Sequence, residues 1–350
     1  MNSKKTLLSV VIANALAVSA VAQANELEIY GSIAGAVENI DNGADSFMQV
    51  NNNHSAFGIK GGTDLGGGLK GVFLFDTFLG MDSGDSGNKS LFGGGRDGYV
   101  GLEAGFGTIA LGYHGRPWKT STNNMDIFGS TIADYSALMG ATPGGAYFDG
   151  GIGSSVIWFM PDFSGLSGHL QFGADESDDD TSDMGVQLNY SANNMYLAFS
   201  HDVDGQGSGP GIDDITATKI AGQFSFGATT VGLIFDSISN GDNNSRDAFW
   251  LAGSHKMGSL TLKAAFAQAD DSDAAGEDGA TYIALGLDHA FKENVTGYVI
   301  YSQISNDDNG LYSFTSEPHT SSNSKTALSA AGEDTSVFAV GVRVDFSLKK

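Results

Sequence analysis

"TSVFAVGVRVDF", residues 335–346, alternates large apolar side chains with small or charged ones. Extended backbone would place on one face Phe338, Val340, Val342, Val344 and Phe346. It would place on the other face Gly341, Arg343 and Asp345. A period of two residues is that of a β-strand, and a tilted strand needs only about 9–11 residues to cross a bilayer. The stretch therefore predicts a membrane-crossing strand with one face in lipid.

The beginning of the chain repeats this pattern. In "ELEIYGSIAGAVE", residues 26–38, one face would carry Leu27, Ile29, Ile33 and Val37. The opposite face would carry Glu28, Tyr30, Ser32 and Glu38. The first and last strands are thus alike, as expected of the two strands that close a barrel.

Between these two stretches the chain repeats one unit, a strand of roughly nine to thirteen residues followed by a turn or a loop. The predicted strands are 26–38, 50–61, 69–80, 96–104, 107–114, 153–160, 167–175, 183–191, 194–202, 215–226, 229–239, 247–257, 259–269, 280–291, 294–304 and 335–346. The predicted fold is all-β: a single sixteen-stranded antiparallel transmembrane β-barrel over residues 25–350.

The connections alternate between two kinds. Short turns such as "AGFG" (104–107) and "FKEN" (291–294) alternate with long acidic loops such as "DESDDDT" (175–181). Short turns on one rim and long loops on the other are typical of outer-membrane barrels. In such a wall the strand 69–80, which is apolar on both faces, can face lipid on one side and a loop folded into the lumen on the other.

The first 24 residues predict a cleaved signal peptide, with the mature chain starting at Asn25. Lys4 and Lys5 precede an apolar stretch, and Ala22-Gln23-Ala24 fits the small-x-small cleavage rule. A membrane anchor is the alternative. It is disfavoured because the apolar stretch holds about 15 residues, fewer than the roughly 20 that span a bilayer.

Composition and charge exclude several classes of protein. The chain has 50 glycines in 350 residues, roughly twice the usual share, with 5 prolines and no cysteine, which is typical of a large all-β protein with many turns. Two of the 17 Lys and Arg, and none of the 41 acids, lie in the predicted signal peptide, so the mature net charge is −26. A surface this acidic excludes nucleic acid as a partner.

Residues 115–152 break the pattern of short turns and acidic loops. This loop is long and rich in apolar side chains, with only Asp126, Asp134 and Asp149 as acids. Long loops in compact folds tend to be functional, and so many apolar residues must pack against something. Its stretch "STIADYSALMG", residues 130–140, has the apolar spacing of a short helix.

Four stretches resemble the Gram-negative general diffusion porins. They are "EIYGSIAGAVE" (28–38), "SAFGIKGGTDLGGGLKGVFLF" (55–75), "GRDGYVGLEAGFGTIALGYHGRP" (95–117) and "SSVIWFMPDFSGLSGHLQF" (154–172), and they follow the family's order along the whole mature chain. The resemblance implies a homotrimer of sixteen-stranded barrels whose third loop, here 115–152, narrows the pore. It implies passive passage of small hydrophilic solutes across the outer membrane without a cofactor, and no enzyme activity.

The family's constriction sets acids on this loop against basic residues on the facing wall. Carried over, the resemblance implies Asp126, Asp134 and Asp149 on the loop side and Arg96 on the wall, with Lys60, Lys263 and Arg343 as further wall candidates. The basic wall is thinned, because the family's basic positions carry Ser32, Ala56 and either Ile157 or Phe159. The C-terminus also departs from the family's terminal aromatic residue, since "SLKK" follows Phe346. With the net negative charge, this arrangement predicts a preference for cations.

Aromatic residues near strand ends predict positions at the membrane interfaces. They are Tyr30, Tyr99, Phe163, Tyr190, Phe291 and Tyr298.

Other functions remain open on the sequence. A channel selective for sugars or organic solutes would need a row of aromatic side chains along the lumen. An outer-membrane enzyme is disfavoured because the seven histidines form no known catalytic spacing. The acidic loops lack the spacing of calcium motifs, so no metal site is expected, although divalent ions could bridge them to lipopolysaccharide.

Overall fold

The computed structural model describes residues 26–80, 92–141, 148–174, 182–205, 214–239, 245–273, 276–314 and 330–350. The predicted signal peptide, residues 1–24, lies outside the described residues. The strands are β1 (Glu26–Asp41), β2 (Ser46–Asn52), β3 (Ala56–Gly66), β4 (Leu69–Leu79), β5 (Phe92–Ala104), β6 (Gly107–Gly115), β7 (Gly151–Phe159), β8 (Leu166–Gly173), β9 (Asp183–Ala192), β10 (Met195–Asp204), β11 (Ile215–Phe226), β12 (Thr229–Ser239), β13 (Arg246–Met257), β14 (Leu260–Ala269), β15 (Ala280–Lys292), β16 (Val295–Asn306) and β17 (Thr335–Lys349). Two short helices, α2 (Pro117–Thr120) and the 3-10 helix η1 (Tyr135–Ala137), lie between β6 and β7. Neither of the helices in these ranges is long and apolar enough to cross a membrane.

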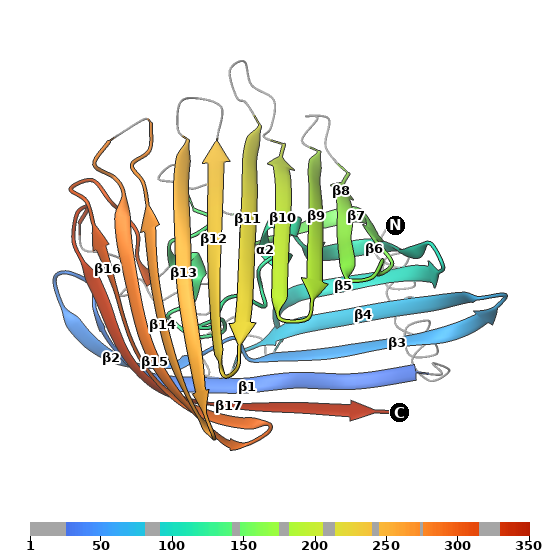
Figure 1. Ribbon diagram of the computed structural model, residues 1–350, viewed down its shortest axis with the longest axis horizontal. Helices are drawn as coiled ribbons and strands as arrows, with labels where there is room; N and C mark the ends of the chain where they lie inside the picture. The colour runs from blue at the N-terminus through green and yellow to red at the C-terminus, as the bar shows by residue number, and fades with distance from the viewer. Residues whose placement is uncertain are drawn as a thin grey trace, which may run out of the picture.

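The strands form a closed antiparallel barrel (Figure 1). Each strand from β3 to β17 pairs with the next, and β17 returns to pair with β1 over Glu28–Asp41. The first half of β1 pairs with β3 and its second half with β2, so β2 and β3 share one position in the wall. The seventeen segments of the described chain therefore make sixteen wall strands, as predicted.

The break between β2 and β3 was not expected, since the sequence predicts one strand over 50–61. His54 adopts a positive φ of 58°. At the break, the Ser55 hydroxyl replaces a backbone hydrogen bond between β1 and its neighbouring strand. Its Oγ accepts from the Ala34 amide at 2.9 Å and donates to the Ala34 carbonyl at 3.1 Å. A side chain thus satisfies backbone groups that the interrupted ladder leaves open.

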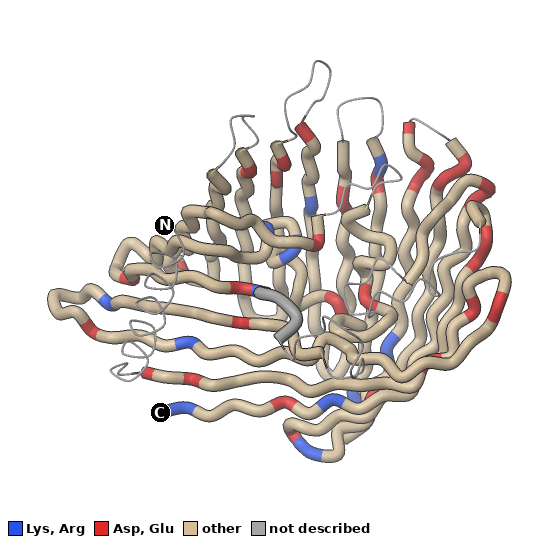
Figure 2. The backbone as a smooth tube through the Cα atoms, turned by 180° about the vertical axis from the view of Figure 1, so that it is seen from behind, with Lys and Arg blue, Asp and Glu red and all other residues tan. Residues whose placement is uncertain are grey.

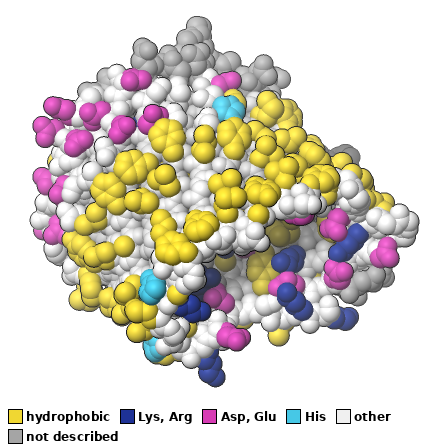
Figure 3. Space-filling model, viewed as in Figure 1, with side chains coloured by type: hydrophobic (Ala, Val, Ile, Leu, Met, Phe, Trp, Pro, Cys, Tyr) yellow, Lys and Arg dark blue, Asp and Glu magenta, His cyan; other side chains and the backbone are white. Residues whose placement is uncertain are grey.

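Alternation along each strand separates an apolar outer face from an inner face. On β12, Leu233 is 50% exposed and its neighbour Ile234 is 0% exposed. Leu233 pairs with Leu251 of β13, and Ile234 with the buried Trp250, so neighbouring strands keep the same faces. Apolar side chains cover much of the outer surface across β9–β16 (Figure 3). A bilayer accepts such a face because the closed ladder leaves no backbone group unpaired toward lipid.

The two rims differ in their connections and in charge. The start of β1 at Glu26, the end of β17 at Lys349 and the tight turns lie on one rim, which we call the short-turn rim. Gly227 and Gly258 adopt φ of 63° in two of these turns, a conformation that favours glycine. Asp and Glu gather at the opposite ends of the strands, where the long connections lie (Figure 2).

Three of the predicted interface aromatics point inward. Tyr30, Tyr99 and Tyr298 share the inner face with residues such as Asp76, which accepts a hydrogen bond from the Tyr30 hydroxyl at 3.0 Å. The prediction for them was wrong because a position near a strand end does not determine which face a residue takes. Phe163, Tyr190 and Phe291 are exposed near the short-turn rim.

Candidate pore site

The described parts of the loop, residues 115–141 and 148–152, contact the inner face of the strands from β8 to β15. Its backbone carbonyls accept hydrogen bonds from wall side chains: Ser121 from Tyr196 at 2.7 Å, Leu138 from Arg246 at 3.2 Å, and Ala133 from Tyr282. These wall residues lie opposite in parity to the exposed apolar face. The loop is held at several points along its length, which fixes where its backbone lies.

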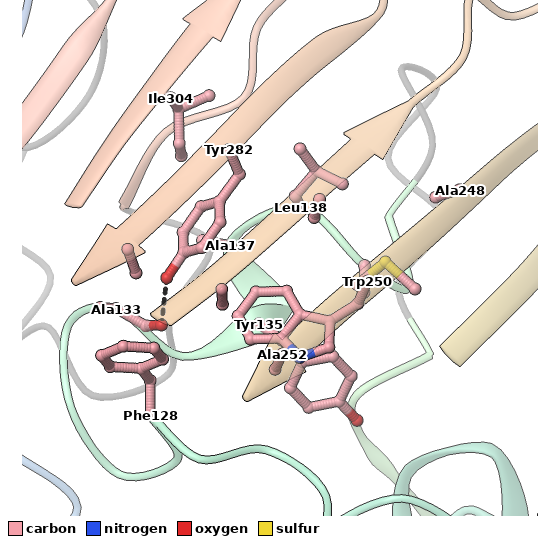
Figure 4. Close-up of a cluster of buried hydrophobic side chains, with 14 of the residues drawn as sticks. Phe128, Ala133, Tyr135, Ala137, Leu138, Ala248, Trp250, Ala252, Tyr282 and Ile304 are labelled. Carbon is pink, nitrogen blue, oxygen red and sulfur yellow. Dashed lines mark hydrogen bonds between the residues drawn. The ribbon is translucent and has the colours of Figure 1, made fainter. Parts of the chain in front are cut away.

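Apolar side chains of the loop form a core with the wall (Figure 4). Trp118 stacks on Tyr135 with ring centroids 6.1 Å apart, and Tyr135 meets Trp250 of β13 edge to face at 5.9 Å. Phe128 and Leu138 are also fully buried. Each such side chain contributes about 1.5–3 kcal/mol to the stability of the packed loop when it is fully buried. This gain explains why the loop is rich in apolar residues.

The predicted short helix over 130–140 is only the 3-10 turn η1. Asp134 caps this turn by accepting from the Ser136 amide at 3.0 Å, and Gly140 has a φ of 79°. Side-chain capping and a positive φ both compete with continued helix. The helical turn α2 begins instead at Pro117, whose fixed φ suits a helix start.

Two wall cations are buried beneath the loop, and neither was predicted from the sequence. The Lys219 ammonium of β11 donates to the Trp118 carbonyl and the Thr122 hydroxyl, each at 2.9 Å, and lies 3.0 Å from the Trp118 ring centroid. Arg246 of β13 lies 3.9 Å from Asp236, and both side chains are fully buried. Burying a charge is costly unless it is paired and hydrogen-bonded, so these contacts tie the loop position to the wall. Inward parity on a strand was the only sequence signal for either residue.

The start of the loop carries two further cations that the sequence analysis passed over. Arg116 pairs with Asp183 at 3.2 Å and with Asp204 of β10. Lys119 pairs with Asp149 at 3.1 Å. Burial raises the pKa of Asp149, and Lys119 offsets this only in part. Burial alone would lower the pKa of Lys119, but Asp149 raises it above its usual value.

The other predicted loop acids hold the shape of the loop. The Asp126 carboxylate accepts from the Phe128 amide at 2.8 Å and from the Tyr135 amide at 3.1 Å. Asp134 accepts from the Ser130 amide at 3.3 Å in addition to capping η1. Burial and the neighbouring Asp134 raise the pKa of Asp126 well above its usual range.

The predicted wall cations each lie beside a wall carboxylate rather than a loop acid. Arg96 lies 3.8 Å from Asp76 and 5.1 Å from the centroid of the Phe78 ring. Three further pairs have the same character: Lys60 with Glu28 at 3.3 Å, Lys263 with Asp288 at 2.9 Å, and Arg343 with Asp345 at 2.8 Å. We call the partly exposed inner residues Glu28, Tyr30, Lys60, Arg96 and Arg343 the open wall.

A closed barrel with an apolar outside, a charged inner face and a long loop packed along that inner face defines the class of transmembrane β-barrel channels. The family model described as Gram-negative porin matches residues 8–309, and the chain belongs to this family. It is an outer-membrane protein that forms a porin channel.

Relatives and solved structures agree with this family. The major outer membrane protein P.IB of Neisseria gonorrhoeae is 24% identical over 341 residues, which cover 85% of this chain and 92% of that relative. An anion-selective porin from Comamonas acidovorans has a TM-score of 0.79 at 20% identity and covers 92% of this chain and 100% of its own. OmpT of Vibrio cholerae in a trimer form has a TM-score of 0.64 at 15% identity, with 91% of this chain and 99% of its own covered.

Proposed function

We propose that the protein is a general diffusion pore that passes small hydrophilic solutes and ions without a cofactor or an energy source. One observation carries this proposal. The loop 115–152 packs on β8–β15, and the charged open wall on β1, β3, β5 and β17 stays partly exposed. An aqueous path can therefore run between the loop and this wall.

The narrowest part of this path lies between the loop and the open wall. On the loop side we propose Asp126, Asp134 and Asp149, and on the wall side Arg96, Lys60 and Arg343. The loop would set the size cutoff of the pore.

We further propose a preference for cations that comes mainly from the acidic rim. Each cation of the open wall has a carboxylate neighbour, so the open wall itself is close to neutral. The acids at the long-connection rim then dominate the potential that ions meet. The Comamonas acidovorans structure is that of an anion-selective porin, but a likeness of fold at 20% identity leaves the sign of selectivity to this chain's own charges.

The assembly we propose is a homotrimer, in line with the trimer form of the Vibrio cholerae neighbour. Lipopolysaccharide would surround it in the outer leaflet, with divalent ions bridging to the acidic loops. Native mass measurement of the detergent-purified protein should give three subunits. A single subunit at all protein concentrations would remove the trimer and leave the channel proposal standing.

Planar bilayers and liposomes test the proposed function. The purified protein should give ohmic single-channel steps in KCl, and liposomes containing it should swell in sugars at rates that fall smoothly with solute size. Swelling with one solute class only, independent of size, would favour a selective channel instead. No conductance and no swelling would exclude a pore.

A further inference from the structure

A cavity of about 480 Å³ opens on the inner wall at the short-turn rim. It lies over the beginning of β1, the middle of β3 and the beginning of β4, a region that Figure 3 shows hollowed and edged by charged side chains. Ligand pockets in proteins usually span about 300–1,000 Å³, so this cavity can hold a small molecule. It lies apart from the buried contacts of the loop, and no residue of the described parts of the loop, 115–141 and 148–152, lines it.

One side of the cavity is aromatic. Tyr99 of β5 and Phe159 of β7 lie with ring centroids 5.5 Å apart, and both are partly exposed. His114 supports them from behind at 5.1 Å from Phe159 and is fixed by Asp97, which lies 2.8 Å from its Nδ1. A planar ring entering the cavity would find two aromatic side chains already positioned, which lowers the entropic cost of stacking.

The other side of the cavity carries charges that are unevenly paired. The Glu28 carboxylate is shared by two ammonium groups, Lys60 at 3.3 Å and Lys349 at 3.6 Å. Glu103 is exposed and lies opposite Lys70 of β4 in the register. The Lys70 ammonium is bound by Glu26 at 2.5 Å, so Glu103 forms no ion pair of its own within the described ranges. The cavity therefore offers positive charge beside Glu28 and a carboxylate outside the ion pairs at Glu103, and both lie on the same lining as Tyr99.

The C-terminal extension builds part of this lining. Residues 347–349 continue β17 along β1, with Lys349 opposite Glu28 in the register. The Lys350 amide donates to the Leu27 carbonyl at 2.9 Å, which fixes the end of the chain. A strand that stopped at Phe346 would lack the second ammonium at Glu28.

We propose that this cavity is a binding site for a small aromatic zwitterion, a solute with a planar ring, a carboxylate and an ammonium group, such as an aromatic α-amino acid. The ring lies against Tyr99 and Phe159, the carboxylate between Lys60 and Lys349, and the ammonium against Glu103. The proposal rests on the proposed pore function, since the solute reaches the site through the lumen. It adds weak retention of one solute class to a pore that otherwise passes solutes by size.

The test is block of KCl conductance by added solutes in planar bilayers with the full-length mature protein. The probe with all three groups is L-phenylalanine. Each of the other three probes lacks one group: glycine lacks the ring, 3-phenylpropionate lacks the ammonium, and phenethylamine lacks the carboxylate. L-phenylalanine should block at concentrations at least tenfold below those of glycine. Tyr99→Leu should raise the half-blocking concentration of L-phenylalanine about three- to tenfold, the range of one aromatic contact.

Two charge variants separate the groups of the ligand. Lys349→Gln should weaken block by L-phenylalanine and 3-phenylpropionate but leave phenethylamine unchanged. Glu103→Gln should weaken block by L-phenylalanine and phenethylamine but leave 3-phenylpropionate unchanged. Lys256→Gln removes a lysine near the same rim, on β13 away from the cavity, and should change none of the half-blocking concentrations.

The outcomes separate this inference from the proposed function. Normal KCl conductance in every variant shows that the barrels have folded and conduct. Equal block by all four probes, or block that Tyr99→Leu and Lys349→Gln leave unchanged, would overturn the binding site and leave the pore intact. Absence of conductance in the unmodified protein would overturn the pore itself.

Discussion

At the scale of single residues, ion pairs with neighbouring side chains determine how much net charge a wall residue presents to the lumen. The Arg96 guanidinium lies 3.8 Å from Asp76 and over the Phe78 ring, so wall groups partly balance its charge. Lys219 is also a basic side chain but lies wholly beneath the loop, where its ammonium binds the Trp118 carbonyl. Two basic side chains on distant strands of one barrel, β5 and β11, thus have different roles because only one of them faces water.

Arg96→Ala should make the channel more selective for cations. The substitution removes a partly exposed positive charge and leaves the Asp76 carboxylate unbalanced beside the pore. A reversal potential across a KCl gradient measures the change, with Arg343→Ala as a matched loss of one cation elsewhere on the open wall. A variant that is less cation-selective than its parent would mean that Arg96 does not line the narrowest part.

Asp126 should make loop packing depend on pH. Its pKa is raised in the folded state, so the folded protein binds this proton more readily than the unfolded chain, and stability falls as pH rises from the ordinary Asp pKa through the raised one. Tryptophan fluorescence during denaturant unfolding at a series of pH values measures this. Asp126→Asn should reduce that slope, to which the raised pKa of Asp149 also contributes, while Asp64→Asn at the exposed end of β3 should leave it unchanged. A slope unchanged in Asp126→Asn would assign it to another group.

At the scale of elements, the loop 115–152 behaves as a part of the barrel interior. Its apolar side chains complete a core with β13 and β15, and its carbonyls accept from wall side chains. Neither the loop nor the inner wall beneath it could satisfy these groups alone. The buried side chains of Lys219 and Arg246 therefore hold the loop against wall strands that are far from it in sequence.

Lys219→Met should loosen the loop. The Trp118 carbonyl and the hydroxyls of Thr122 and Tyr135 would lose their shared donor inside the barrel, a cost of about 1–3 kcal/mol. Thermal unfolding followed by tryptophan fluorescence should start earlier, and single-channel current should become noisier. Lys256→Met, at an exposed end of β13, is the control and should match the unmodified protein. Equal unfolding temperatures and equal current noise in the two variants would contradict the view that Lys219 holds the loop in place.

Deletion of residues 124–141 should raise the single-channel conductance. The deletion removes Asp126, Asp134 and the part of the loop that packs on Trp250 and Tyr282, so the lumen widens. Planar-bilayer recordings at fixed salt measure the step size. An unchanged step would show that this part of the loop lies outside the conducting path.

At the scale of the whole molecule, acids outnumber bases and gather at one rim. The full chain has a formal net charge of −24, and Asp and Glu mark the strand ends at the long connections (Figure 2). A field of this kind attracts cations to the mouth, but salt screens it over about 10 Å at 0.1 M.

Cation preference should therefore weaken as salt rises. Reversal potentials measured at a constant KCl ratio should shift toward zero between about 0.1 M and 1 M, where the screening length falls to about 3 Å. Any preference that persists at high salt belongs to the constriction. Anion preference at low salt would contradict the whole-molecule argument and place the decisive charges on wall residues other than those proposed.

The sequence by itself determined the wall of this protein. In stretches such as 335–346 and 26–38, the alternation of side chains along the chain alone defines the two faces of a strand. The strands, their number and the pairing of the first with the last could therefore be predicted without tertiary information. The same holds for the alternation of short and long connections. The role of a residue in the wall depends on which face of its strand it occupies and on what lies opposite that face. The break at His54 between β2 and β3 shows that the inward face can change from odd-numbered to even-numbered residues within one predicted strand.

Only the tertiary structure decided which inner residues meet water. Lys60 and Lys219 both sit on inner faces of strands, but the loop covers Lys219 and leaves Lys60 exposed beside Glu28. Likewise Tyr99, predicted for a membrane interface, contacts Phe159 from a strand about sixty residues away. It also lines one cavity together with Lys349 near the end of β17. Such neighbourhoods arise from closure of the barrel, which brings together residues whose separation along the chain carries no signal of their contact.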